Sequence, residues 1–262
     1  MTPNHPAVLT FSGHDPSGGA GVQADIETLA SHRCHPVSVI TALTEQDTLN
    51  VKKLISQNPD NIVNQAKTLM ADIPVKAIKI GLLGHPETAL AVHGIIKQCP
   101  HIPVVFDPVL AAGGGTDLSN ERLIALINDL LLPCTTVLTP NSEEARRLTG
   151  LDDLKECGLS LLEKGCGYVL ITGTHETTPE VSNQLFHDGR CYETYSWNRL
   201  PYSYHGSGCT LAASIAALLA QGLDIFHAIA EAQEFTWNSL NSGHQPGKGQ
   251  HIPNRFYWVN DE

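Results

Sequence analysis

Short apolar runs rich in β-branched residues alternate along the chain with longer stretches in which apolar residues recur every three or four positions. The short runs are typical of buried strands, and the longer stretches are typical of amphipathic helices. Asp60 is a candidate cap for one helix, and Asp188-Gly189 a candidate hairpin turn within residues 183–196. Strands are predicted at residues 7–13, 35–43, 75–83, 103–109, 135–141 and 167–173. Helices are predicted at residues 21–32, 59–73, 87–98, 120–131, 142–150, 210–221 and 224–240.

Repeated strand–helix pairs with continuous apolar strands indicate an α/β fold, in which a mostly parallel sheet lies between two layers of helices. No internal repeat, low-complexity tract or linker interrupts the pattern, so one domain is expected over residues 1–262. In such folds the ligand lies beyond the carboxyl ends of the strands. The loops that follow predicted strands carry residues 12–21, residues 45–47, Asp107, Asn141 and Thr172.

Composition narrows the class of protein. Hydrophobic residues make up 42% of the chain and charged residues 16%, which suits a soluble protein with a full core. The formal charge of -11 argues against a nucleic-acid partner, because neutralising phosphates needs a surplus of Lys and Arg. The 7 cysteines include no C-x-x-C pair, which favours a reducing compartment over a zinc site or disulfides. Neither a signal peptide nor an apolar run of about 20 residues is found, so a cytoplasmic protein with no membrane segment is expected.

The segment YHGSGCTLAAS places small residues and a cysteine where a helix begins. Apolar residues at helical spacing predict that this helix starts near Thr210, directly after Gly206, Ser207, Gly208 and Cys209. The first amides of a helix have no internal partners and form a site for anions such as a transferring phosphoryl group. The helix dipole is expected to lower the thiol pKa, which suits a proton acceptor or a nucleophile. The alternative is a buried cysteine beside a glycine turn.

The loop SGHDPSGGAGVQAD joins the first predicted strand to the first helix and contains Gly13, Gly18, Gly19 and Gly21. It matches neither the G-x-G-x-x-G spacing nor the G-x-x-x-x-G-K-[ST] phosphate loop, so glycine content alone is weak evidence for a phosphate site. Asp25 lies one turn into the helix, where an acid stabilises the helix dipole even without a ligand.

Carboxylates follow two later strands. Asn141 and Glu144 are three residues apart, which places them on one helix face at the end of a strand. The carboxylate of Glu144 could bind a hard cation such as Mg²⁺ there, although Asn141 and Glu144 also fit a capping box. Asp107 ends a very apolar strand and either faces the ligand crevice or caps its turn.

These segments occur together, and in this order, in one family. GHDPSGGAGVQAD, VITALTEQDT, KIGLL, FDPV, TPNSEE, GSGCT and GKGQHIP resemble the hydroxymethylpyrimidine/phosphomethylpyrimidine kinases of thiamine synthesis, within the ribokinase superfamily. The resemblance runs from about Ala7 to Pro253. It implies a three-layer αβα fold, usually a homodimer, that uses ATP and Mg²⁺ to phosphorylate the pyrimidine hydroxymethyl group and then the resulting monophosphate.

The resemblance also implies roles for individual residues. Cys209 matches the base that takes the hydroxyl proton. Gln46 matches the glutamine that pairs with the pyrimidine edge. Gly13, Asp25 and Leu82 match other positions of the substrate pocket, and Gly206, Ser207 and Gly208 match the anion hole. Asp107, Asn141 and Glu144 match the positions that organise the metal and the phosphates, with Glu144 and Asp107 nearest the metal.

The chain departs from close relatives at Thr172, which stands where they place a lysine against the transferring phosphates. Lys248 is a candidate replacement, although a solvated loop lysine is the simpler interpretation. Three alternatives to the pyrimidine kinase stay open: a pyridoxal kinase of the same fold, a hydrolase that uses Cys209 with His205 or His175, and a catalytically weakened protein that binds thiamine precursors.

Overall fold

One nine-stranded sheet runs through residues 5–259, the part of the chain that the computed structural model describes. The strands are ordered β3-β2-β1-β4-β5-β6-β7-β8-β9 across the sheet. Neighbours from β2 to β7 are parallel, and β3, β8 and β9 pair antiparallel at the two edges. The strands are β1 (Ala7–His14), β2 (His35–Gln46), β3 (Val51–Ser56), β4 (Val75–Ile80), β5 (Val104–Phe106), β6 (Val137–Leu138), β7 (Tyr168–Ile171), β8 (Glu180–His187) and β9 (Arg190–Asn198).

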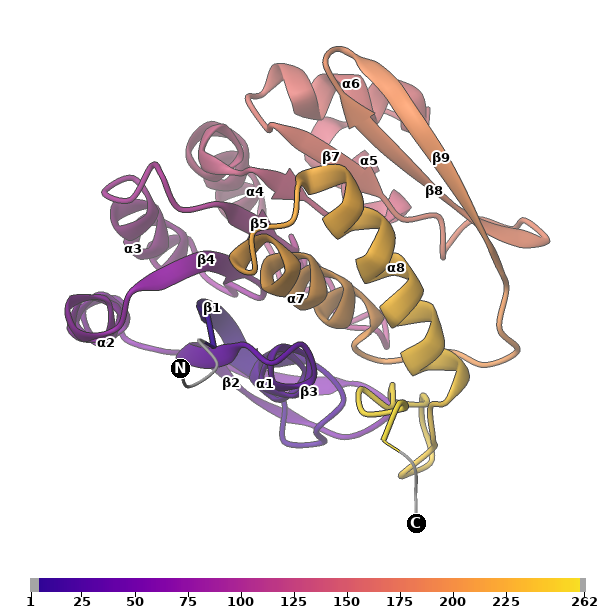
Figure 1. The fold of residues 1–262 in the computed structure, drawn as a ribbon, viewed down its shortest axis with the longest axis horizontal. Coiled ribbons are helices and arrows are strands. Elements are labelled where there is room, and N and C mark those ends of the chain that lie inside the picture. Colours follow the sequence, from indigo (N-terminus) through magenta and orange to yellow (C-terminus); the bar gives the residue numbers. More distant parts are fainter. Residues whose placement is uncertain (1–4, 260–262) are drawn as a thin grey trace.

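Helices cover both faces of the sheet, which confirms the predicted three-layer α/β fold (Figure 1). One layer holds α1 (Gly21–Ser31), α7 (Ser207–Ala220) and α8 (Ile225–Asn241). The other holds α2 (Pro59–Asp72), α3 (Pro86–Ile96), α4 (Glu121–Leu126), α5 (Ser142–Thr149) and α6 (Leu154–Glu163). A π-helical turn (Ile127–Leu131) and a 3-10 turn (Leu132–Cys134) continue α4.

Alternation along the central strands divides the core between these two layers. Val8 and Ala77 face the layer of α1, α7 and α8, whereas Leu9 and Ile78 face the opposite layer. All four side chains are fully buried. Because both sides of the sheet are covered, residues of β1 and β4 are buried on either face and most of them are apolar, with Lys79 as a charged exception. Their carboxyl ends meet at one edge, which carries the site described below.

The structure differs from the predicted elements in a few places. Strand β3 and helix α6 were not predicted, and β5 and β6 are shorter than expected. Helix α7 begins at Ser207 instead of Thr210. The cap of α2 is Asn58, whose side chain accepts from the amides of Asp60 and Asn61, so Asp60 is not the cap. The hairpin turn at Asp188-Gly189 is confirmed, since both residues have positive φ.

Candidate active site

A cavity of about 650 Å³ lies at the carboxyl ends of the parallel strands. Loops that follow β1, β4, β5, β6 and β7 contribute to its wall, together with the carboxyl end of β2 and the first turn of α7. Its size is typical of sites for small molecules and cofactors. All but one of the predicted site residues line it, namely Gly13, Gln46, Leu82, Asp107, Asn141, Glu144, Thr172, Gly206, Ser207, Gly208 and Cys209.

The start of α7 opens into this cavity without a cap of its own. Gly206 is the N-cap residue, with a φ of 86°, and among residues 5–259 no side chain accepts a hydrogen bond from the first turn. A Cβ on Gly206 would lie 1.9 Å from the carbonyl oxygen of Gly19, so only glycine fits between the two loops. The first backbone bond of the helix runs from the amide of Thr210 to the carbonyl of Gly206. The amides of residues 207–209 are therefore free to bind an anion.

Arg255 fixes this turn against the glycine-rich loop. Its side chain is buried, with 1% exposed, and it donates to the carbonyl of Gly19 and to the hydroxyl of Thr210. Glu27 balances its charge at 2.8 Å. The glycine-rich loop and the start of α7 are distant in sequence, and this cation holds them together. Sequence reasoning did not identify it.

Cys209 is partly exposed at the third position of α7. Burial, together with the charges of Asp107 and Asp25, raises the pKa of its thiol to about 12, although Lys79 opposes the rise. The predicted lowering of this pKa by the helix dipole is therefore wrong. A helix dipole stabilises a charge by only about 0.3–1 kcal/mol. Desolvation and the repulsion from two nearby carboxylates destabilise the thiolate by more than this.

Asp107 and Glu144 form a pair of buried carboxyls, 4% and 8% exposed, beside this helix start. A Cβ on Gly208 would lie 3.4 Å from Asp107 Oδ1, which places Asp107 against the first turn of α7. Burial raises the pKa of Asp107 to about 6, and burial plus the charge of Asp107 raises that of Glu144 to about 8. Asp107 Oδ2 is buried and has no hydrogen-bond partner among residues 5–259. Two mutually repelling carboxyls with an unpartnered oxygen are a suitable place for a cation.

Asn141 and Glu144 also form the capping box that the sequence left as an alternative. The Asn141 side chain accepts from the Glu144 amide at 2.9 Å, and Glu144 Oε2 accepts from the Asn141 amide at 2.9 Å. Glu144 Oε1 remains directed toward the loop that contains Leu110, whose amide it meets at 3.4 Å. The cap holds Glu144 in the cavity wall, so the structural and the ligand-binding interpretations of this pair are compatible.

Thr172 lies next to this pair, since its carbonyl accepts from the Ser142 amide at 3.0 Å. It lines the cavity but brings no charge to it. Lys248 is exposed and does not line the cavity, so it does not replace the lysine that relatives place there.

Asp25 is the predicted site residue that the cavity wall does not include. It is fully buried behind the wall in an ion pair with Lys79, whose Nζ lies 2.8 Å from Asp25 Oδ1. Burial lowers the pKa of Lys79, but the charges of Asp25, Cys209 and Asp107 outweigh burial and raise this pKa above its ordinary value. Sequence reasoning missed Lys79, although a lysine within an apolar central strand is a signal for a buried pair.

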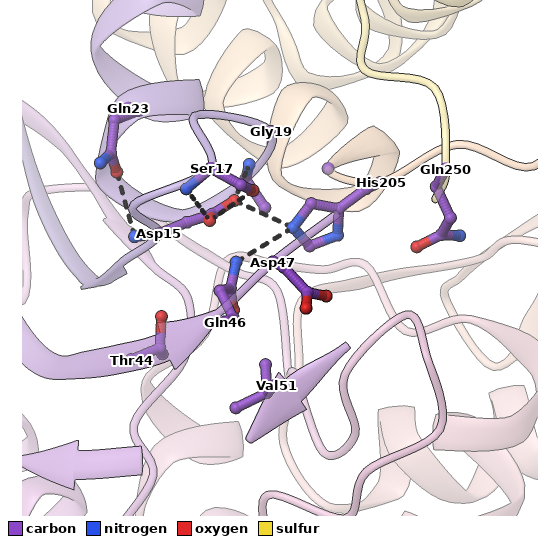
Figure 2. Close-up of polar contacts among 12 residues, drawn as sticks. Asp15, Ser17, Gly19, Gln23, Thr44, Gln46, Asp47, Val51, His205 and Gln250 are labelled. Carbon is purple, nitrogen blue, oxygen red and sulfur yellow. Dashed lines mark hydrogen bonds and ion pairs between the residues drawn. The ribbon is translucent and has the colours of Figure 1, made fainter. Parts of the chain in front are cut away.

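His205 is the third residue whose role the sequence did not predict. Its Nε2 lies 2.9 Å from Asp15 Oδ2 and 3.4 Å from Gln46 Nε2, so it links the glycine-rich loop to the predicted pyrimidine-binding residue (Figure 2). His175 lies 4.0 Å from Glu143 instead. Within the described part of the chain no hydrogen bond joins either histidine to Cys209. The histidine–cysteine pair that a cysteine hydrolase needs is not formed.

Comparisons with known proteins match this chain to kinases of hydroxymethylpyrimidine, phosphomethylpyrimidine and pyridoxal. The profile of the phosphomethylpyrimidine kinase family matches residues 15–254. A hydroxymethylpyrimidine/phosphomethylpyrimidine kinase of Synechococcus elongatus is 36% identical and covers 96% of this chain and 98% of its own. An ADP complex of Bacillus subtilis pyridoxal kinase superposes with a TM-score of 0.89 at 28% identity, over 97% of this chain and 99% of that one. The structure of a phosphomethylpyrimidine kinase of Clostridium difficile superposes with a TM-score of 0.76 at 31% identity, over 88% of this chain and 97% of that one.

No helix among residues 5–259 has the length and apolar character that crossing a bilayer requires.

Proposed function

The chain belongs to the phosphomethylpyrimidine kinase family, a family of ribokinase-like phosphotransferases, and on this premise we propose what it phosphorylates and how. Its substrate is 4-amino-5-hydroxymethyl-2-methylpyrimidine, followed by the monophosphate of that compound, with ATP as phosphoryl donor. The observation that carries the proposal is the uncapped start of α7, which opens into the cavity beside Asp107, Glu144 and Cys209. Free amides beside two carboxyls suit a phosphoryl group in transfer.

The substrate hydroxyl lies near Cys209 and attacks the γ-phosphorus in line. The amides of residues 207–209 stabilise the negative charge that develops on the phosphoryl oxygens. They are already fixed by Arg255, so they need no rearrangement during the reaction. Gly13 and Leu82 form the wall at which the pyrimidine binds, since a Cβ on Gly13 would come 2.8 Å from Leu82 Cδ2 and close that space.

Asp107 and Glu144 would hold Mg²⁺, directly or through water, together with the phosphates of ATP. The cation supplies charge neutralisation to those phosphates. Within the described residues no group of three or more His, Cys, Asp and Glu side chains could hold a metal. Two carboxylates suit Mg²⁺, because it keeps several waters and shares its remaining positions with substrate phosphates.

The proton of the substrate hydroxyl has two possible acceptors in this chain. Cys209 is the acceptor that the family resemblance implies, but its raised pKa keeps it a thiol at neutral pH in the free protein. Asp107, with a pKa of about 6, is mostly ionised at pH 7. A base whose pKa lies near the working pH is the more effective, which favours Asp107 where Mg²⁺ is held through water and the carboxylate stays free. Comparing Cys209→Ala with Asp107→Asn in single-turnover measurements separates the two assignments.

A pyridoxal kinase is the second candidate function, because a pyridoxal kinase superposes on this chain over 97% of its length. Sequence separates the two substrates poorly, and both have a hydroxymethyl group on a six-membered nitrogen ring. Thr172 in place of a lysine leaves the third possibility, a protein that binds the pyrimidine with little turnover.

One assay separates these functions. ADP release is followed with hydroxymethylpyrimidine, its monophosphate and pyridoxal in parallel, at equal enzyme and ATP concentrations. We expect the highest kcat/KM with hydroxymethylpyrimidine and measurable turnover of the monophosphate. Turnover of pyridoxal alone would refute the substrate proposal, and binding without turnover would favour the weakened protein. We also propose that the chain forms a homodimer, as the family resemblance implies, and light scattering tests this separately.

A further inference from the structure

Asp15 follows strand β1 and accepts hydrogen bonds from four donors, two on each carboxylate oxygen. The amide and the hydroxyl of Ser17 donate to Oδ1 at 2.8 and 2.7 Å. The amide of Ala20 and Nε2 of His205 donate to Oδ2 at 2.8 and 2.9 Å. Every lone-pair direction of this carboxylate is therefore occupied by an N–H or O–H group.

This environment fixes the proton on His205. Burial raises the pKa of Asp15, but the hydrogen bonds from His205, Ser17 and Ala20 outweigh burial and hold it well below its ordinary value. An ionised carboxylate only accepts, so the ring nitrogen that faces it must carry a hydrogen. His205 therefore has its proton on Nε2, and that nitrogen has no lone pair left with which to accept a hydrogen bond in the ring plane.

The side-chain amide of Gln46 meets the same ring nitrogen. With Gln46 Nε2 lying 3.4 Å from His205 Nε2, one donor would face another. The two ends of an amide have nearly the same shape, so the chemistry of the neighbours decides their orientation. With the oxygen turned toward His205, it shares the one Nε2 hydrogen with Asp15 Oδ2 in a three-centre bond, and two donors no longer face each other. The NH₂ group then takes the opposite end of the amide, on the side of the cavity that Gln46 lines.

His205 is also held in place by packing. A Cβ on Gly19 would lie 2.5 Å from His205 Cδ2, so the ring rests directly on the glycine-rich loop. The backbone amide of His205 donates to the carbonyl of His251 at 2.8 Å. Packing and this backbone bond support the ring where it contacts both Asp15 and Gln46 (Figure 2).

We propose that Asp15 and His205 are a positioning pair that holds Gln46 with its amide oxygen toward His205 and its NH₂ group toward the cavity. The cavity then offers a hydrogen-bond donor to an acceptor nitrogen on the ring of the ligand. This assignment of ligand chemistry rests on the proposed function, in which the ligand is an aminopyrimidine. The orientation of the amide itself does not depend on it.

The first experiment examines the free protein. Long-range ¹H–¹⁵N correlation spectra of the histidine side chains report which ring nitrogen carries the proton, and His205→Gln identifies the signals of His205. We expect protonated Nε2 at pH 7. An unprotonated Nε2 overturns the proposal, because that nitrogen would accept from Gln46 and reverse the amide.

The second experiment measures specificity in wild type, Asp15→Asn and the control Asp47→Asn. Asp47 is the residue next to Gln46; its carboxylate accepts from the amides of Leu49 and Asn50 and pairs with Lys52, and it has no hydrogen bond or ion pair with His205. The substrates are hydroxymethylpyrimidine and its two analogues in which one ring nitrogen is replaced by C–H. In wild type and in Asp47→Asn, one replacement should raise KM about tenfold while kcat changes little, as expected for one lost hydrogen bond in a buried site.

In Asp15→Asn, the KM for the parent pyrimidine should rise. The KM of the same analogue should then exceed that of the parent by less than about threefold, a smaller penalty than in wild type, because the amide of Gln46 can turn. An equal penalty in Asp15→Asn and wild type, or no penalty for either analogue in wild type, overturns the proposal. If the wild type turns over no pyrimidine at all, the proposed function fails instead, and the protonation of His205 alone decides whether the positioning pair exists.

Discussion

Replacing Lys79 with methionine should cost this protein a large part of its stability. Lys79 and Asp25 are both fully buried, with Nζ and Oδ1 2.8 Å apart, and the hydroxyl of Ser12 also donates to Asp25. Removing one member of a buried pair leaves an uncompensated charge, which costs about 3–5 kcal/mol. The whole free energy of unfolding of a typical protein is only about 5–15 kcal/mol. With a urea m value of about 3 kcal/mol/M, the unfolding midpoint should fall by about 1–1.7 M.

Two further variants make this test specific. Lys76→Met changes an exposed lysine of the same strand and should alter the free energy of unfolding by less than about 0.5 kcal/mol. Lys79→Met combined with Asp25→Leu should recover most of the loss, because no buried charge is left unpaired. A loss below about 1 kcal/mol in Lys79→Met, or a double variant less stable than the single one, would refute the reasoning.

Three more predictions follow from the site and its supports. Cys209→Ala should lower kcat by about 10²-fold or more if Cys209 takes the substrate proton, while the KM for ATP changes little; unchanged turnover in steady-state kinetics would assign the proton to Asp107. Gly13→Ala should raise the pyrimidine KM about tenfold, because its Cβ would lie 2.8 Å from Leu82 Cδ2 and displace that side chain into the cavity; an unaltered KM would remove Gly13 from the binding wall. Burial lowers the pKa of His32 from 6.5 to about 4, so only the unfolded chain binds this proton between those values and stability falls as pH decreases from 6.5 to 4, by up to about 3 kcal/mol. His32→Phe should flatten that dependence in urea titrations at pH 5 and 7, and equal slopes in both proteins would contradict it.

The predicted strands and helices rest on a strong pattern, and most of them are present. Strand β3 was missed because four of its six residues, among them Lys52 and Lys53, are exposed and interrupt the apolar run. Helix α6 carried a usable signal, since Asp153 caps it and Cys157 and Leu161 occupy buried positions at helical spacing. It was missed because it follows α5 closely and its apolar stripe is narrow.

The members of the candidate site were easier to predict than their electrostatics. The residues followed from loops at the ends of strands and from a family resemblance, and the cavity includes them except Asp25. The pKa of Cys209 was predicted in the wrong direction, because the sequence reveals the helix start but not the nearby carboxylates or the burial. Lys79 and His205 act through partners far away in sequence, 54 and 190 residues for their contacts to Asp25 and Asp15. Such pairs become visible only when the sheet brings the loops together.

The most direct test of the account is a structure of this protein with hydroxymethylpyrimidine, ADP, Mg²⁺ and aluminium fluoride, which together mimic the phosphoryl group in transfer. The account predicts the fluoride ligands within about 3 Å of the backbone nitrogens of residues 207–209, with the substrate hydroxyl in line on the opposite side from ADP. Aluminium fluoride bound elsewhere in the cavity, with those nitrogens bonded only to water, would contradict it.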